Sequence, residues 1–129
     1  MFRTMLKSKI HRATVTDANV DYPGSITIDE KIMAAADILE HEKVHVLSLT
    51  SGNRLETYAI AGVAGSGQIC VNGAAAKLVL KGEKIIILTY AQVDEVSAAD
   101  FTSKVVLIDE NNNIAAVDEK GSVFNSCQS

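Results

Sequence analysis

Short runs in which apolar and polar residues alternate recur along the whole chain and constrain its fold more than any other feature. Successive side chains of a β-strand point to opposite faces, so this period-2 pattern is typical of strands. The predicted strands span residues 4–15, 26–28, 43–50, 54–61, 68–71, 84–93, 104–109 and 114–117. Many short strands in a chain of 129 residues favour one small β-barrel domain, because a barrel removes exposed sheet edges.

Helical signals are short by comparison. Asp29 is placed to cap a helix over residues 30–36, because its carboxylate can accept hydrogen bonds from the free N–H groups of the first turn. Residues 74–76 predict one helical turn, and the Asn72–Gly73 pair before them predicts a tight turn. The chain is therefore expected to be mainly β, with short helices.

Charge and hydropathy exclude several classes of protein. A formal net charge of −4 offers no electrostatic case for a nucleic-acid partner. The longest aliphatic run, residues 85–88, is far too short to cross a bilayer, and no signal peptide is expected. The two cysteines, Cys70 and Cys127, are too few for a disulfide framework. We therefore expect a cytoplasmic domain with reduced thiols and no membrane partner.

The segment from His41 to His45 matches the H-E-x-x-H pattern of zinc proteases. That pattern binds zinc only on a helix, where residues four apart lie above one another. The residues from Val44 onward alternate like a strand, which would separate the two histidines by roughly 13 Å. We therefore interpret them as surface residues and expect no metal site.

The stretch DYPGSITI, residues 21–28, places a serine directly after a glycine where a turn meets a strand. The hydroxyl of Ser25 can attack the carbonyl carbon of Gly24 and convert the amide into an ester. Elimination from the ester and loss of ammonia would leave a pyruvoyl group, whose carbonyl forms a Schiff base with an amine and withdraws electrons. Because Gly-Ser pairs are common in turns, this pair alone does not establish such chemistry.

Several longer motifs accompany this pair. They are Arg3–Arg12, Tyr22–Ser25, Gly52–Ile60 and Val71–Ala76. Together they resemble the aspartate 1-decarboxylase family, pyruvoyl-dependent enzymes that make β-alanine for pantothenate and coenzyme A biosynthesis. The resemblance covers residues 1–117, and the polar remainder, 118–129, is expected to be a flexible tail. Pro23 departs from the usual family pattern before the glycine and is expected to alter the rate of cleavage.

The resemblance implies a role for each matching residue. The chain would be a zymogen that cleaves itself between residues 24 and 25 and turns Ser25 into the covalent cofactor, with neither pyridoxal phosphate nor metal. Tyr58 would protonate the carbanion after carbon dioxide leaves. Residues expected to hold the substrate are Lys9, Arg54, Thr57, Gly73, Ala74 and Ala75; those expected to act in self-processing are His11, Tyr22, Gly24, Ser25, Thr57 and Asn72.

Taken singly, these residues have plainer interpretations. Arg54 and Lys9 would be solvated charges, Tyr58 a packing tyrosine and His11 a structural histidine. The pairing of two cations does suit a diacid such as L-aspartate. The sequence leaves open another pyruvoyl amino-acid decarboxylase, or an unprocessed β-barrel binding module.

The resemblance also implies a double-psi β-barrel assembled as a homotetramer, with active sites between subunits. The sequence is compatible with spontaneous cleavage and with cleavage that needs a maturation factor.

Overall fold

The computed structural model describes residues 1–124 of the chain, which are mainly β. The strands are β1 Phe2–Thr14, β2 Asp17–Asn19, β3 Ser25–Asp29, β4 Lys43–Ser48, β5 Arg54–Gly62, β6 Ile69–Asn72, β7 Lys84–Asp94, β8 Lys104–Ile108 and β9 Ile114–Asp118. The helices are α1 Glu30–Ala35, the 3₁₀-helix η1 Gly73–Lys77 and α2 Glu95–Ala98. Every predicted strand is present, and so are the helix after Asp29 and the turn at residues 74–76.

Two short elements were not predicted, and one predicted turn needs correction. The three-residue strand β2 was not predicted, because Asp17 and Asn19 are poor strand formers and only pairing with β6 makes the segment a strand. The four-residue α2, capped by Asp94, is too short to show a helical period. Asn72 and Gly73 do not form a two-residue turn, because Asn72 ends β6 and Gly73 begins η1.

The nine strands of residues 1–124 join one sheet in the order β2-β6-β3-β5-β4-β7-β1-β8-β9. Three pairs, β1 with β8, β2 with β6 and β3 with β5, are parallel, and the others are antiparallel. The predicted mainly β, double-psi-barrel type of fold is confirmed. The hydrogen-bonded ladder stays open, however, with β2 and β9 at its two ends.

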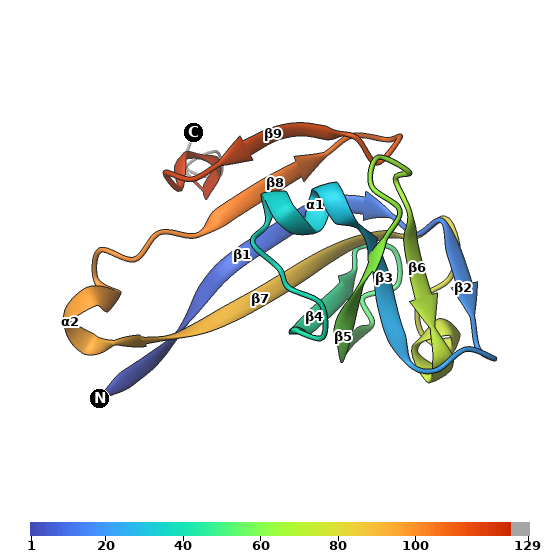
Figure 1. Ribbon diagram of the computed structural model, residues 1–129, viewed down its shortest axis with the longest axis horizontal. Coiled ribbons are helices and arrows are strands. Elements are labelled where there is room, and N and C mark those ends of the chain that lie inside the picture. Colours follow the sequence, from blue (N-terminus) through green and yellow to red (C-terminus); the bar gives the residue numbers. More distant parts are fainter. Residues whose placement is uncertain (125–129) are drawn as a thin grey trace.

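The longest ladder joins β1 to β7 and extends to α2 at one end of the molecule, while β2, β3, β5 and β6 gather at the other end (Figure 1). The register of β1 shifts between Leu6 and Ser8 and again between His11 and Ala13. Such bulges bend a strand and re-aim its side chains. Lys9 and His11 lie in the segment between the two bulges.

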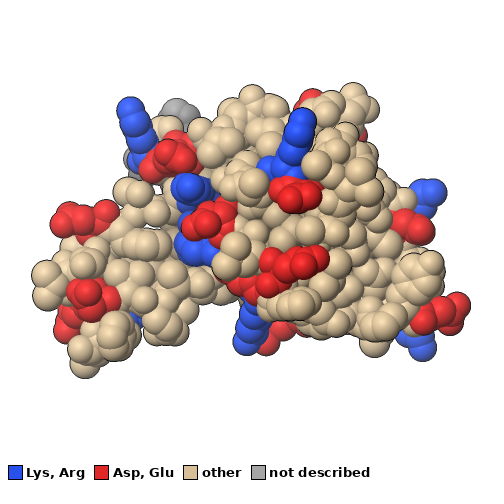
Figure 2. Space-filling view, in the orientation of Figure 1, with Lys and Arg blue, Asp and Glu red and all other residues tan. Residues whose placement is uncertain are grey.

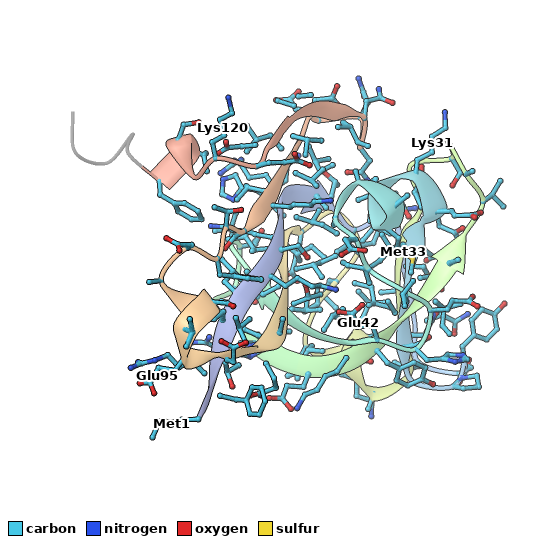
Figure 3. All side chains as sticks on the ribbon, turned by 60° about the vertical axis from the view of Figure 1, so that its left-hand side comes forward. Met1, Lys31, Met33, Glu42, Glu95 and Lys120 are labelled. Carbon is cyan, nitrogen blue, oxygen red and sulfur yellow. The ribbon has the colours of Figure 1, made fainter. Side chains whose placement is uncertain are left out.

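The core consists of aliphatic side chains from the strands and from α1. Each fully buried one contributes about 1.5–3 kcal/mol to folding. The largest are Ile10, Ile26, Ile28, Ile32, Ile69, Ile85 and Ile87. On α1, Met33 points into this core whereas Lys31 points outward (Figure 3).

Asp29 joins the end of β3 to the start of α1. Its carboxylate accepts hydrogen bonds from the backbone N–H groups of Lys31 at 2.8 Å, Gly65 at 3.0 Å and Gly67 at 2.8 Å. Burial acts to raise the pKa of this carboxyl group, but the three donors outweigh it and hold the pKa below its ordinary value. Asp29 therefore anchors the loop between β5 and β6 as well as the helix.

Beyond β9 the described chain makes a turn around Asp118. The carboxylate of Asp118 accepts hydrogen bonds from the backbone N–H groups of Lys120 and Val123. The ring of Phe124 then lies 6.0 Å from the Nζ atom of Lys9. The division of the chain at residue 117 stays a prediction, and residues 125–129, including Cys127, lie outside the described part.

Charged side chains of both signs are interspersed over the face shown in Figure 2. Among the described residues, no helix is both long and apolar enough to cross a membrane.

Candidate active site at the Gly24–Ser25 junction

The Gly24–Ser25 bond crosses from an exposed turn into a buried strand. Tyr22, Pro23 and Gly24 are exposed, whereas Ser25, the first residue of β3, is only 6% exposed. The side chain of Asn19 steadies the turn by accepting a hydrogen bond from the backbone N–H of Asp21 at 3.0 Å. The serine hydroxyl is thus held inside the fold while the residue before it lies at the surface.

Four polar side chains meet where β3 pairs with β6. Ser25 lies opposite Asn72, and Thr27 lies opposite Cys70. The Nδ2 atom of Asn72 donates hydrogen bonds to Ser25 Oγ at 3.0 Å and to Thr27 Oγ1 at 3.2 Å. At the other end of the same amide, the Cys70 thiol donates to Asn72 Oδ1 at 3.2 Å. Buried polar groups need such partners, and here each member of the cluster has one.

Gly73 packs directly against the chain that precedes Ser25. A Cβ atom at position 73 would lie 2.6 Å from Gly24 Cα, 2.8 Å from Gly24 N and 3.2 Å from the carbonyl oxygen of Tyr22. The φ angle of Gly73 is +74°, in the left-handed region that disfavours side chains. Only glycine meets both conditions, so the start of η1 can press against the junction.

A cavity of ≈ 310 Å³ adjoins the junction. Its lining residues are Gly24, Leu55, Glu56, Thr57, Asn72, Ala74, Ala75 and Leu78. Five of them are predicted site residues, drawn from the turn before β3, from β5, from β6 and from η1. The structure therefore brings Gly24, Ser25, Thr57, Asn72, Gly73, Ala74 and Ala75 together, with Tyr22 beside them.

Lys9, His11, Arg54 and Tyr58 do not line this cavity. Lys9 and His11 lie on β1, which β5, β4 and β7 separate from β3 in the sheet. Arg54 and Tyr58 are exposed, and Tyr58 points to the face of β5 opposite Thr57, because neighbouring strand residues alternate. Within one chain, these four predicted site residues therefore lie outside the cavity that Gly24, Thr57, Asn72, Ala74 and Ala75 line.

His11 occupies an unusual environment on β1. Its Nδ1 atom is buried and has no hydrogen-bond partner among residues 1–124. Burial, followed by the positive charges of Lys9 and Arg12, lowers the pKa of the imidazole. The neutral form is therefore favoured at neutral pH.

Thr27 and Cys70 were not predicted as site residues. A signal was present, since Ser25 and Thr27 alternate with isoleucines in β3, while Cys70 and Asn72 alternate with Ile69 and Val71 in β6. Alternation marks each pair as sharing one face. It does not say that the two faces meet.

The H-E-x-x-H segment has no helical geometry. Strand β4 begins at Lys43, as predicted, and His41 precedes it with a φ angle of +71°. The Nδ1 atom of His45 lies 3.3 Å from the hydroxyl of Tyr90, whereas the ring of His41 meets that of Tyr58 edge-on at 6.4 Å. No group of three or more potential metal-binding side chains occurs within residues 1–124.

The fold and the junction place the chain in the class of small double-psi β-barrel proteins. Residues 1–115 match the family model described as aspartate decarboxylase. The aspartate 1-decarboxylase of Acetivibrio thermocellus is 60% identical over 114 residues, which cover 88% of this chain and 90% of the relative. The aspartate 1-decarboxylase of Thermoanaerobacter pseudethanolicus is 57% identical over 112 residues, covering 87% and 96%. The chain belongs to the aspartate decarboxylase family.

Proposed function

We propose that this protein is a self-processing, pyruvoyl-dependent enzyme that converts L-aspartate to β-alanine and carbon dioxide for pantothenate and coenzyme A biosynthesis. Family membership makes it a decarboxylase, a carbon–carbon lyase. The observation that supports the self-processing step is the junction itself. Gly73 packs against Gly24, and Asn72 donates a hydrogen bond to Ser25, beside a cavity.

The first proposed reaction is cleavage of the chain. Ser25 Oγ attacks the Gly24 carbonyl carbon, and the amide nitrogen is released as the ester forms. Elimination from the ester then frees residues 1–24 with a carboxylate end and leaves a dehydroalanine at position 25. Hydrolysis of this dehydroalanine releases its nitrogen as ammonia and leaves the carbonyl of the pyruvoyl group. Asn72 holds Ser25 Oγ in place through its 3.0 Å hydrogen bond. Thr57, which lines the same cavity, is proposed to donate to the Gly24 carbonyl oxygen.

The residues around the junction fit a pyruvoyl group, because it would arise from Ser25 in its buried position at the start of β3. That group supplies a carbonyl that binds an amine and withdraws electrons from the carbon that loses carbon dioxide. Gly73, Ala74 and Ala75 allow close approach of a small substrate. No pyridoxal phosphate or metal is part of the proposal.

The remaining site residues are proposed to come from a neighbouring subunit of a cytoplasmic homotetramer. Lys9, Arg54 and Tyr58 do not line the cavity within one chain, so assembly would bring them to it. Arg54 and Lys9 would bind the substrate carboxylates, since guanidinium forks onto a carboxylate. Tyr58 would donate the proton that replaces the lost carboxylate, with His11 and Tyr22 shaping the site during cleavage.

Intact-mass measurement of the purified protein tests this proposal. We expect two fragments, residues 1–24 and 25–129, the larger one lighter by one ammonia than simple hydrolysis would leave it. Its blocked amino terminus should resist Edman degradation. A single intact chain after prolonged warming would rule out self-processing, and the chain would then be an unprocessed module. Turnover of another amino acid in preference to aspartate would indicate a different pyruvoyl decarboxylase.

A further inference from the structure

The side-chain amide of Asn72 is held at both ends. Its Nδ2 atom donates to Ser25 Oγ and Thr27 Oγ1, while its Oδ1 atom accepts from the Cys70 thiol at 3.2 Å. Asn72 is 5% exposed and Cys70 is 6% exposed, so water competes little for these bonds. Of the three partners, only Cys70 contacts the oxygen end.

The orientation of this amide decides whether Ser25 Oγ faces a hydrogen-bond donor or an acceptor. With Nδ2 toward Ser25, an N–H donor lies on the hydroxyl oxygen and stabilises the negative charge that grows there as the proton leaves. If the amide turned by half a rotation, Oδ1 would instead accept a hydrogen bond from the Ser25 hydroxyl and would lie next to the negative charge once the proton has left. The observed orientation therefore stabilises the developing alkoxide of Ser25, whereas the reversed one would place a partly negative oxygen beside it.

The chemistry of a thiol explains which orientation is preferred. A neutral thiol can donate one hydrogen bond and is a weak acceptor. Burial, together with the Asp17 carboxylate, raises the pKa of the Cys70 thiol, which keeps its proton in place. The S–H group therefore pairs better with the amide oxygen than with the amide nitrogen.

We propose that Cys70 is a positioning residue for self-cleavage, because its S–H bond to Asn72 Oδ1 keeps Asn72 Nδ2 directed at Ser25 Oγ. The inference rests on the proposed self-processing of Ser25. Cys70 itself does not line the cavity beside the junction. Its effect passes through Asn72 alone.

Substitution at position 70 separates donation from packing. Cys70→Ser keeps a donor, so we expect cleavage within about threefold of the parental rate. Cys70→Ala removes the donor and should slow cleavage by about five- to tenfold, within the span of about two- to twelvefold that one neutral hydrogen bond covers. If the alanine variant does not fold, Cys70→Val is measured instead, because valine fills the space and has no hydrogen-bond donor. Time courses of the cleaved fraction at fixed temperature measure these rates.

A double-variant comparison tests whether the effect passes through Asn72. In an Asn72→Ala chain, adding Cys70→Ala should not slow cleavage further, because no amide remains to be oriented. In an uncleavable Ser25→Ala chain, the losses of unfolding temperature for Cys70→Ala and Asn72→Ala should likewise be less than additive.

Three results would overturn the inference alone, given a parent that cleaves: an unchanged rate in Cys70→Ala, equal slowing in Cys70→Ser, or the same slowing in the Asn72→Ala background. A parent that never cleaves would overturn the proposed function and the role of Cys70 in it together. The thermal coupling between Cys70 and Asn72 would still show whether the hydrogen bond exists.

Discussion

At position 73 a single hydrogen atom, in place of a side chain, lets the backbone approach the scissile bond. Gly73→Ala would place a Cβ atom 2.6 Å from Gly24 Cα at a φ angle of +74°. We expect a loss of about 1–3 kcal/mol in unfolding free energy and a marked slowing of cleavage, because the clash moves the Gly24 carbonyl carbon relative to the attacking Ser25 Oγ.

Gly82→Ala is the matched control for this change. Gly82 has a φ angle of +90°, yet a Cβ atom there would meet nothing within 4 Å. It should lose stability through backbone strain and still cleave at the parental rate. Equal cleavage rates in the two variants would show that the contact between Gly73 and Gly24 does not matter for processing.

Tyr58 has a proposed role that differs from that of Ser25. Tyr58→Phe removes only the phenol oxygen, so the chain should still cleave into its two fragments. Its decarboxylation rate should fall by roughly 10²–10⁴-fold, the usual contribution of a placed acid. Tyr90→Phe is the control, since Tyr90 is similarly exposed, at 43% against 39%. Normal turnover in Tyr58→Phe would mean that the proton comes from another group.

At the scale of elements, the junction depends on how β3 is anchored at its far end. Ser25 begins this strand and Asp29 ends it, where the Asp29 carboxylate holds both α1 and the loop before β6. Strand β3 then pairs with β5 on one side and with β6 on the other. The pairing with β6 places Asn72 opposite Ser25, and β5 carries Thr57 to the cavity that Gly24 and Asn72 also line.

The depressed pKa of Asp29 makes this anchor sensitive to pH. The folded state favours the ionised carboxylate more than the unfolded chain does, so its stabilising contribution is complete above the ordinary aspartate pKa. It disappears as the pH falls through the lowered pKa of the folded state. Asp29→Asn should therefore cost on the order of 1–3 kcal/mol at neutral pH and flatten the acid side of the stability curve.

Unfolding temperatures measured across the acid range check this expectation. Asp118→Asn is the comparison, because the pKa of Asp118 is also lowered, by backbone hydrogen bonds from Val123 and Lys120, but its turn follows the last strand. It should change the unfolding temperature little. An equal effect from both substitutions would contradict a special role for Asp29.

At the scale of the whole molecule, the separation of Lys9 from the Ser25 cavity predicts a site shared between subunits. Co-expressed Lys9→Ala and Ser25→Ala chains should form mixed tetramers. Some of their sites would combine Ser25 from the first chain with Lys9 from the second. With equal amounts, we expect up to about a quarter of the parental activity. As a control, co-expression of Lys9→Ala with the Lys9→Ala/Ser25→Ala double variant should restore no activity, because neither chain carries Lys9. If the first mixture recovers no activity, Lys9 and Ser25 of one site belong to the same subunit.

Local patterns in the sequence were enough to predict most of the elements. Alternation predicted every strand except β2 to within two residues at either end, and the helix that follows Asp29 was predicted from capping chemistry alone. The motifs around Gly24, Thr57 and Asn72 predicted the family. Each of these signals lies within a few neighbouring residues, so no knowledge of the tertiary structure was needed to read it.

Strand order, register and the membership of the site required the tertiary structure. The pairing of Ser25 with Asn72 and of Thr27 with Cys70 joins residues more than forty positions apart, and a shift of one residue would turn each side chain to the other face. The burial of the isoleucine core selects the register in which the polar faces of β3 and β6 meet. The sequence determined which residues alternate, whereas packing of the whole chain decided that Cys70 faces Asn72 and that Lys9 lies away from Ser25.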